Sequence, residues 1–305
     1  MTTGFNAQST AAEVVAGIDL TGRRVVVTGG SSGIGVETAR ALAGAGADVT
    51  LAVRDLAAGQ RTAVDITATT GRPVGVARLD LSDQASVAAF TANWDGPLHI
   101  LVNNAGVMAT PLTHTPEGWE LQFATNHLGH FALTNGLHRA LASEGARVVS
   151  VSSAGHLGSD VVFDDIHYRA RPYNPWEAYG QSKTANILFA VEASQRWAAD
   201  GITVNSLMPG VIRTNLTRHI DEEELNRRIR ERATAIVWKT VEQGAATSVL
   251  VATSPALDGV GGKYFEDCAE AGLNVPGERT GVAPYAIDPE SAARLWKVSE
   301  EILAG

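Results

Sequence analysis

The sequence predicts an α/β protein whose centre is a doubly wound, Rossmann-type parallel sheet of about seven strands with helices on both faces. Two observations lead to this prediction. Short apolar runs rich in Val, Ile and Leu alternate with stretches of helical periodicity, which is typical of parallel sheets buried on both faces. A glycine-rich stretch at residues 28–35 also follows the apolar run 25–27, as in the strand–loop–helix turn that binds a dinucleotide pyrophosphate.

The expected elements follow one another without an internal repeat or a linker, so we expect one domain over residues 1–305. Residues 1–22 would be an N-terminal extension in which the capping-box sequence Thr-Ala-Ala-Glu, residues 10–13, starts a short helix. The expected strands are residues 24–28, 48–53, 74–78, 100–103, 147–152, 203–207 and 262–265. The expected helices include residues 34–45, 84–93, 119–142, 179–198 and 241–252, the last of which follows a second capping box.

The composition limits the possible partners. A formal net charge of −9 over 305 residues makes nucleic acids and anionic membranes poor candidates. Cys268 is the only cysteine, so no intrachain disulfide can form. The chain has no signal-peptide pattern, and no uncharged apolar stretch approaches the ~20 residues that cross a bilayer. We therefore expect a cytoplasmic protein that acts on a small molecule.

Tyr179 and Lys183 stand four residues apart in the sequence Tyr-Gly-Gln-Ser-Lys. On a helix, residues at this spacing share a face. An ammonium group beside a phenol lowers the pKa of the phenol from its ordinary value of about 10. Such a tyrosine can move a proton to or from an alcohol oxygen near neutral pH. Together with the glycine-rich loop, the pair predicts hydride transfer between a nicotinamide and a carbon–oxygen bond.

Further motifs lie between and beyond these two features. In chain order they are Asp80-Leu81, the run Asn-Asn-Ala-Gly at residues 103–106, Asn126 within Ala-Thr-Asn-His, Ser153 after the fifth expected strand, and Pro209-Gly210 with Thr214. In this order the motifs resemble the short-chain dehydrogenase/reductase family, and the resemblance covers nearly the whole chain. It implies a nicotinamide-dependent oxidoreductase.

On the cofactor side, Gly29, Gly33 and Gly35 are expected to form a tight turn that lets the backbone approach the pyrophosphate. Ile34 would form an apolar wall, and Ser31 and Ser32 complete the loop. The resemblance implies that Asp80 and Leu81 contact the adenine. It also implies that Asn103, Ala105 and Gly106 line the cleft, and that Pro209, Gly210 and Thr214 contact the nicotinamide.

On the chemical side, the resemblance implies that Ser153, rather than the adjacent Ser152, binds the substrate oxygen. Tyr179 would be the general acid/base. Lys183 would lower the pKa of Tyr179 and bind the nicotinamide ribose, and Asn126 would hold a water molecule in the proton relay.

The end of the second expected strand bears on the choice of cofactor. NAD-specific relatives carry an acidic residue there, whereas this chain has Val53 followed by Arg54. A guanidinium can pair with the 2′-phosphate of NADP(H), and we expect the carboxylate of Asp55 to point into solvent. Ser31 and Ser32 stand where many NADP-dependent enzymes carry a basic residue. We favour NADP(H) over NAD(H).

Two features resemble the retinol-dehydrogenase branch of the family, which includes WW-domain oxidoreductases. One is the long interval between Ser153 and Tyr179, and the other is the sequence of residues 262–265 and 293–299. This likeness does not transfer a substrate. We expect a fairly apolar alcohol, aldehyde or ketone, and a homo-oligomer, either a dimer or a tetramer. Residues that could line an apolar pocket, or simply pack in the core, are Trp176, Met208, Trp238 and Tyr264.

Two readings of other segments complete the sequence-based hypothesis. Residues 211–239 lose the strand pattern and are predicted to form a lid over the substrate, with apolar anchors at Leu216, Ile220, Leu225, Ile229 and Trp238. No metal site is expected from His127, His130 and His156, whose spacing fits no ligand set. The alternative functions are a non-catalytic regulator that senses NADP, which would be expected to lack the tyrosine or the lysine, and an extended-type sugar-nucleotide epimerase.

Overall fold

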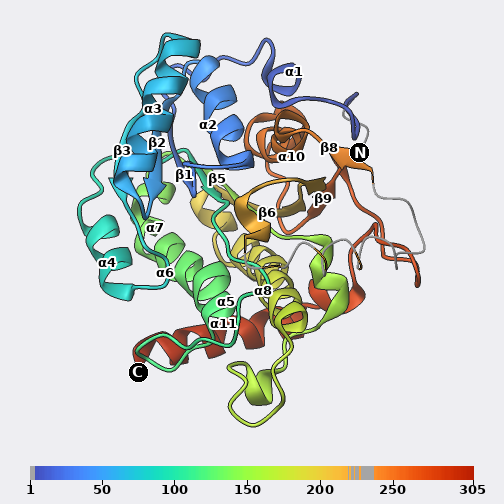
Figure 1. Ribbon diagram of the computed structural model, residues 1–305. Coiled ribbons are helices and arrows are strands. Elements are labelled where there is room, and N and C mark those ends of the chain that lie inside the picture. Colours follow the sequence, from blue (N-terminus) through green and yellow to red (C-terminus); the bar gives the residue numbers. More distant parts are fainter. Residues whose placement is uncertain (1–3, 219, 221–222, 224–226, 228–236) are drawn as a thin grey trace.

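The computed structural model describes residues 4–218, 220, 223, 227 and 237–305, and its centre is an eight-stranded sheet (Figure 1). The strand order is β10-β9-β6-β5-β4-β1-β2-β3, and only β9 and β10 pair antiparallel. The strands are β1 (Arg24–Thr28), β2 (Asp48–Val53), β3 (Gly75–Arg78), β4 (Ile100–Asn103), β5 (Ala146–Val151), β6 (Ile202–Met208), β9 (Tyr264–Glu266) and β10 (Ala269–Glu270). The chain winds outward from β1 to β3 and then from β4 to β10, so the order reverses between β1 and β4. In such sheets, ligands bind at the carboxyl ends of the strands near this reversal.

All seven expected strands form, and the mostly parallel sheet with helices on both faces is confirmed. β10 is an addition at the edge of the sheet. It is joined to β9 by Asp267 and Cys268, both with positive φ (50° and 62°), as in a two-residue hairpin turn. A separate pair of short parallel strands, β7 (Val211–Ile212) and β8 (Trp238–Lys239), joins the two ends of the predicted lid segment.

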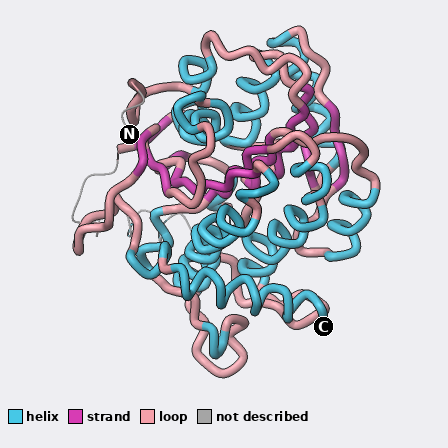
Figure 2. Tube along the Cα trace, turned by 180° about the vertical axis from the view of Figure 1, so that it is seen from behind, coloured by secondary structure: helices cyan, strands magenta, loops and turns pink. Residues whose placement is uncertain are grey.

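Two layers of helices cover the sheet (Figures 1 and 2). α1 (Ala11–Val15), α2 (Ile34–Gly44), α3 (Leu56–Thr70) and α10 (Val241–Thr253) lie on one face, and α4 (Gln84–Ala92), α6 (Gly129–Gly136), α8 (Pro175–Arg196) and α11 (Pro289–Ala304) lie on the other. Each face of the sheet packs against its own hydrophobic core, and successive residues of β1 point to opposite cores. Val25 and Val27 pack in the core that contains Leu42 of α2, whereas Val26 packs in the core that contains Leu101 and the aromatic side chains of the other layer. Both faces of the sheet are therefore buried.

The helices differ from the expectation at several points. The predicted helix 119–142 is divided into α5 (Leu121–Phe123), a π-helical turn (Ala124–Leu128), α6 and α7 (His138–Ala142). α8 begins at Pro175 instead of Tyr179, because the Asn174 side chain accepts hydrogen bonds from the next backbone N–H groups and proline suits the first helical position. α3 and α11 were not among the expected helices. Both predicted capping boxes are confirmed, at Thr10 and Thr240.

None of the helices within the described residues is long and apolar enough to cross a membrane.

Candidate active site

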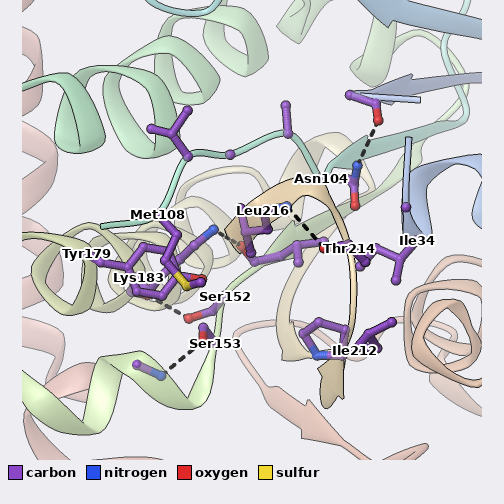
Figure 3. Close-up of a pocket in the computed structure, with 18 of the residues that line it drawn as sticks. Ile34, Asn104, Met108, Ser152, Ser153, Tyr179, Lys183, Ile212, Thr214 and Leu216 are labelled. Atoms are coloured by element: carbon purple, nitrogen blue, oxygen red, sulfur yellow. Dashed lines mark hydrogen bonds between the residues drawn. The ribbon is translucent and has the colours of Figure 1, made fainter. Parts of the chain in front are cut away.

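A cavity of about 940 Å³ runs along the carboxyl ends of the strands. Most of the predicted site residues line it, and the exceptions are Gly35, Asn103 and Asn126, which lie behind its wall. Figure 3 shows Tyr179, Lys183 and Ser153 gathered at one side of this cavity, while Asn104 and Ile34 lie at the other. The structure therefore joins the glycine loop and the Tyr–Lys pair in one continuous space, although the two motifs are about 150 residues apart in the sequence.

The glycine loop closes the turn between β1 and α2. Gly29 has φ 66°, and a Cβ on it would lie 2.9 Å from the Cα of Ala105. A Cβ on Gly35 would lie 2.6 Å from Nδ2 of Asn104. At the start of α2, Gly33 provides no side-chain cap, which leaves the first N–H groups of the helix available to an anion. The loop therefore has the shape and the donors of a pyrophosphate site.

The segment after β4 is held against the glycine loop by Thr28. The Thr28 hydroxyl accepts hydrogen bonds from the backbone N–H groups of Asn104 and Ala105, each at 2.9 Å. Asn104 in turn donates from Nδ2 to the Thr28 carbonyl at 2.8 Å. Asn103 is buried and donates to Thr134 Oγ1 at 2.9 Å, so it ties the sheet to α6 behind the cavity. Asn104, which the sequence reasoning did not select, is the asparagine of the motif that lines the cavity.

Cationic side chains lie at the ends of β2 and β3. Arg54 is exposed and lines the cavity. The carboxylate of Asp55 accepts from the backbone N–H of Ala58 at 3.0 Å, because it caps α3, and so it is committed to the helix. Arg78, which was not among the predicted site residues, lies opposite Val53 in the sheet register. Its guanidinium donates to the Arg54 carbonyl at 3.4 Å. Of these two arginines, only Arg54 lines the cavity.

Ser153 and Tyr179 lie together at the opposite end. The Ser153 hydroxyl accepts from the backbone N–H of Gly155 at 3.0 Å and hydrogen-bonds the Tyr179 side chain. The adjacent Ser152 is buried and donates to the backbone carbonyl of Lys183 at 2.7 Å, so its hydroxyl points to α8. The tyrosine ring packs on Gly155, where a Cβ would lie 2.8 Å from the ring carbon Cε1. The geometry favours Ser153 over Ser152, as the sequence reasoning did.

The protonation of the pair differs from the expectation. Burial raises the pKa of Tyr179 to about 12, and the hydrogen bond with Ser153 opposes this shift. Burial also lowers the pKa of Lys183 to about 8. The Lys183 ammonium donates to the Val151 carbonyl at 3.0 Å and lies 5.7 Å from the centroid of the tyrosine ring. The expected pKa of Tyr179 below its ordinary value is therefore not found, because loss of hydration raises it.

Asn126 lies in the π-helical turn behind the cavity. Its side chain accepts from the backbone N–H of Val107 and donates to the Val107 carbonyl and the Ser182 hydroxyl, each at 2.9 Å. The Ser182 hydroxyl donates to the carbonyl of Tyr179 at 2.8 Å. Asn126 thereby links the loop after β4 to the helix that carries the tyrosine.

The three histidines noted in the sequence are buried and hydrogen-bonded. His127 contacts the Ser299 hydroxyl at 2.8 Å. Nδ1 of His130 contacts the Asn126 carbonyl at 2.9 Å, and Nδ1 of His156 contacts the Ser153 carbonyl at 2.6 Å. Burial lowers the pKa of His127 to about 3 and those of His130 and His156 to about 4, so all three are neutral near pH 7. Over the described part of the chain, no group of three or more His, Cys, Asp or Glu side chains could hold a metal ion.

The predicted lid can be followed only at its ends. Residues 219, 221–222, 224–226 and 228–236 lie outside the described residues, and with them Leu225 and Ile229, so the lid stays a prediction. At its start, Gly210 has φ 106° and is covered by the Lys239 side chain, whose ammonium pairs with Asp267 at 2.5 Å. Residues from both ends that line the cavity are Val211, Ile212, Thr214, Asn215, Leu216, Thr217, Arg218 and Trp238.

The rest of the cavity wall is formed by segments that are distant in sequence. Of the four residues for which the sequence left a pocket or a core position open, Trp176, Met208 and Trp238 line the cavity, whereas Tyr264 is buried and does not line it. Sequence reasoning missed Met108 and Leu157, and also residues 277–279 of the loop after β10. No local motif marks these positions, because they meet only through the topology of the sheet.

Comparison with known proteins agrees with this geometry. The family model described as short chain dehydrogenase matches residues 23–225. Over 302 residues the chain is 53% identical to a Streptomyces lividans protein named "Probable oxidoreductase", covering 94% of this chain and 99% of that one. It is 41% identical over 298 residues to Homo sapiens retinol dehydrogenase 12, covering 94% of this chain and 88% of the relative.

Solved structures give the same result. A crystal structure of a Mycobacterium paratuberculosis protein superposes with a TM-score of 0.74 and 34% identity, covering 97% of this chain and 98% of that one. A dehydrogenase from Agrobacterium tumefaciens with bound NADP superposes with a TM-score of 0.63 and 28% identity, covering 81% and 95%.

Proposed function

The chain belongs to the short-chain dehydrogenase/reductase family, in its retinol-dehydrogenase branch, and on this premise we propose that it is an NADP(H)-dependent alcohol dehydrogenase or carbonyl reductase. Its substrate would be a fairly apolar small molecule. The observation that carries the proposal is the single cavity that joins the uncapped start of α2 to the hydroxyls of Ser153 and Tyr179.

The residues present fit a nicotinamide dinucleotide. The uncapped N-terminus of α2 offers N–H donors to the pyrophosphate. Gly29 and Gly35 allow the tight turn that positions these donors, because a Cβ on either would collide with Ala105 or Asn104. When bound, the cofactor would supply the hydride to a substrate carbon or accept it. Lys183 would hold the ribose next to the nicotinamide.

Charge at the adenosine end supports NADP(H) over NAD(H). Arg54 lines the cavity and would pair with a 2′-phosphate, and Arg78 beside it adds a second positive charge. The Asp55 carboxylate, the acidic group nearest the strand end, is engaged as a helix cap. The A. tumefaciens relative was solved with NADP. An arginine fork paired with a phosphate is a strong, charge-assisted interaction.

The protonation states suit carbonyl reduction. With a pKa of about 12, Tyr179 is a neutral phenol near pH 7 and can donate its proton to the substrate oxygen as negative charge develops there. The Ser153 hydroxyl would donate a hydrogen bond to the same oxygen. Lys183, protonated below about pH 8, would stabilise the phenolate that remains. In alcohol oxidation the same proton would return to Tyr179.

The walls of the substrate end are mainly apolar, which supports a fairly apolar substrate. These residues are Met108, Leu157, Trp176, Met208, Leu216 and Trp238.

The proposal is tested by following the absorbance of reduced nicotinamide while purified protein is mixed with NADPH or NADH and a panel of aryl ketones and medium-chain aldehydes. We expect turnover with NADPH that exceeds turnover with NADH. Tight NADPH binding without turnover of any carbonyl or alcohol would instead support the non-catalytic, NADP-sensing alternative.

A further inference from the structure

The loop between β10 and the C-terminal helix, orange-red in Figure 1, forms one wall of the substrate end. Its two arms are joined by backbone hydrogen bonds, from Asn274 N–H to the Val282 carbonyl and from Val282 N–H to the Gly272 carbonyl, each at 2.9 Å. The N–H of Gly281 donates to the carboxylate of Glu266 on β9 at 2.8 Å. The loop is thus closed on itself and attached to the sheet.

Within this loop the backbone on both sides of Arg279 is fixed by one side chain. Nδ2 of Asn274 donates to the carbonyl of Glu278 at 3.1 Å and to the carbonyl of Thr280 at 2.6 Å. Gly281 has φ 81°, and a Cβ there would lie 2.8 Å from the backbone of Asn274. Arg279 is therefore presented to the cavity from a preorganised turn.

The guanidinium of Arg279 has no hydrogen bond or ion pair with any of the residues that the structure describes. The neighbouring carboxylate of Glu278 contacts the Thr280 hydroxyl at 3.3 Å instead. Arg279 remains exposed because the cavity is open, yet the surrounding protein removes enough water to lower its pKa. A cation in such a place gains more from an anionic partner than one in bulk water does.

The topology assigns Arg279 to the substrate and not to the phosphates of the cofactor. Its loop is attached to β9, and β6, β5 and β4 separate β9 from β1, which leads into the glycine loop. Four steps of about 4.8 Å between neighbouring strands amount to roughly 19 Å. Arg54, at the end of β2, is one strand further away. Tyr179 and the apolar walls line the same cavity as Arg279.

We propose that Arg279 binds a carboxylate carried by the substrate, so that the enzyme selects apolar alcohols and carbonyl compounds that bear an acid group away from the reacting carbon. This inference rests on the proposed function and specifies its substrate class. The apolar walls would hold the body of such a molecule, with Tyr179 at its reacting oxygen and Arg279 at its anionic end. A planar guanidinium suits a carboxylate because it can donate two parallel hydrogen bonds.

The test uses matched pairs of substrates, aryl or alkyl keto acids and the methyl esters of the same acids, with NADPH as the reductant. Wild-type kcat/KM should favour the acid in at least one pair. In Arg279→Gln the acid should lose roughly 10- to 100-fold in kcat/KM, mainly through KM, while the ester changes less than about 2-fold. Arg279→Lys, which keeps the charge, should recover part of the loss. Arg139→Gln, an exposed arginine on α7 outside the cavity, is the control for charge alone.

Three results would overturn the assignment. Equal losses for acid and ester in Arg279→Gln would mean that the arginine only supports the loop. A loss of NADPH affinity of similar size, measured by fluorescence titration, would mean that it serves the cofactor. Wild-type turnover of the esters without any preference for an acid would remove the inference and leave the proposed function standing. If no pair is reduced and the panel of ketones and aldehydes is inert as well, the proposed function fails. Calorimetric binding of an arylalkanoate to wild type and Arg279→Gln then still decides whether Arg279 holds a carboxylate.

Discussion

The two ends of the cavity are constructed in different ways. At the cofactor end the ligand would meet mostly backbone, namely the N–H groups at the start of α2 and the close approach allowed by Gly29 and Gly35. At the substrate end it would meet side chains from segments that are far apart in sequence, including Met108, Trp176 and Arg279. The cofactor end depends on a tight turn between a strand and a helix. The substrate end depends on the side chains of several loops.

This difference indicates which substitutions should act on the cofactor and which on the substrate. A backbone site tolerates few changes, because an added Cβ collides with main-chain atoms. A wall of loop side chains can change without disturbing the sheet. We therefore expect substitutions at the cofactor end to act on cofactor binding with any substrate, and substitutions at the substrate end to act on one substrate more than another. A substitution of Tyr179, the proposed proton donor, should affect turnover alone.

The largest effect is expected for Tyr179→Phe, which should reduce turnover by about 10²- to 10⁴-fold because the proton donor is lost. NADPH affinity should stay within a few-fold of wild type, since the ring still packs on Gly155. Tyr168→Phe is the matched control, because the buried Tyr168 hydroxyl has no hydrogen-bond partner within the described chain. Steady-state kinetics and fluorescence titration measure the two quantities. Near-normal turnover in Tyr179→Phe would contradict the mechanism.

Arg54→Asp should shift the ratio of NADPH to NADH affinity by about 10- to 100-fold toward NADH, because a carboxylate repels the 2′-phosphate and accepts from a 2′-hydroxyl. Arg61→Asp, on the exposed side of α3, makes the same charge change nearby without reaching the cavity. Dissociation constants for both cofactors give the ratio. A wild type that binds NADH more tightly than NADPH would reverse the assignment.

Gly35→Ala tests the backbone site directly. Its Cβ would lie 2.6 Å from Nδ2 of Asn104 and 2.7 Å from the Gly29 carbonyl, so the loop must move, and NADPH affinity should fall by about 10-fold. Gly44→Ala lies on the same helix, where the nearest atom is 3.8 Å from the added Cβ, and it should leave affinity unchanged and stabilise α2 slightly. Similar affinities for the two variants would mean that the loop is more adaptable than its contacts indicate.

A smaller effect should appear in the pH dependence. Lys183 has a pKa lowered to about 8, so it loses its charge as pH rises through that value, while Tyr179, with a pKa of about 12, stays protonated. The kcat/KM for carbonyl reduction should therefore be flat from about pH 6 to 8 and decline above about pH 8, by no more than about 10-fold per pH unit. Intrinsic tryptophan fluorescence at each pH checks that the fold is intact. A profile that rises above pH 8 would exclude Lys183 as the titrating group.

The same contrast explains how far sequence could predict the structure. Strands and the glycine loop are local patterns, and all seven expected strands formed where apolar runs predicted them. The loop at residues 277–279 could not be predicted, because nothing near Arg279 indicates that it reaches a cavity about 100 residues upstream at Tyr179. The pKa of Tyr179 was misjudged for a similar reason. The spacing to Lys183 is visible in the sequence, but the burial that dominates the pKa depends on the whole fold.

Other differences between the predicted and observed structure depend on individual hydrogen bonds and backbone angles, which helix and strand propensities do not predict. The π-helical turn at Asn126 interrupts a segment whose sequence is uniformly helical in pattern. In the Asn-Asn-Ala-Gly motif, Asn103 is held by Thr134 of α6 and Asn104 by Thr28 of β1, so which asparagine faces the cavity depends on contacts with other elements. The β9–β10 hairpin turns at two residues with positive φ that have no glycine to mark them.

The buried histidines should make the stability of the fold depend on pH. His127, His130 and His156 have native pKa values of about 3 to 4, whereas in the unfolded chain their pKa would be about 6.5. Between these values the unfolded state binds more protons, so the free energy of unfolding falls as pH falls, by up to about 1.4 kcal/mol per pH unit for each histidine. Near pH 5 the three together would remove roughly 6 kcal/mol, a large share of the stability of an ordinary protein. The three buried histidines should therefore make the folded state progressively less stable as pH falls below about 6.5.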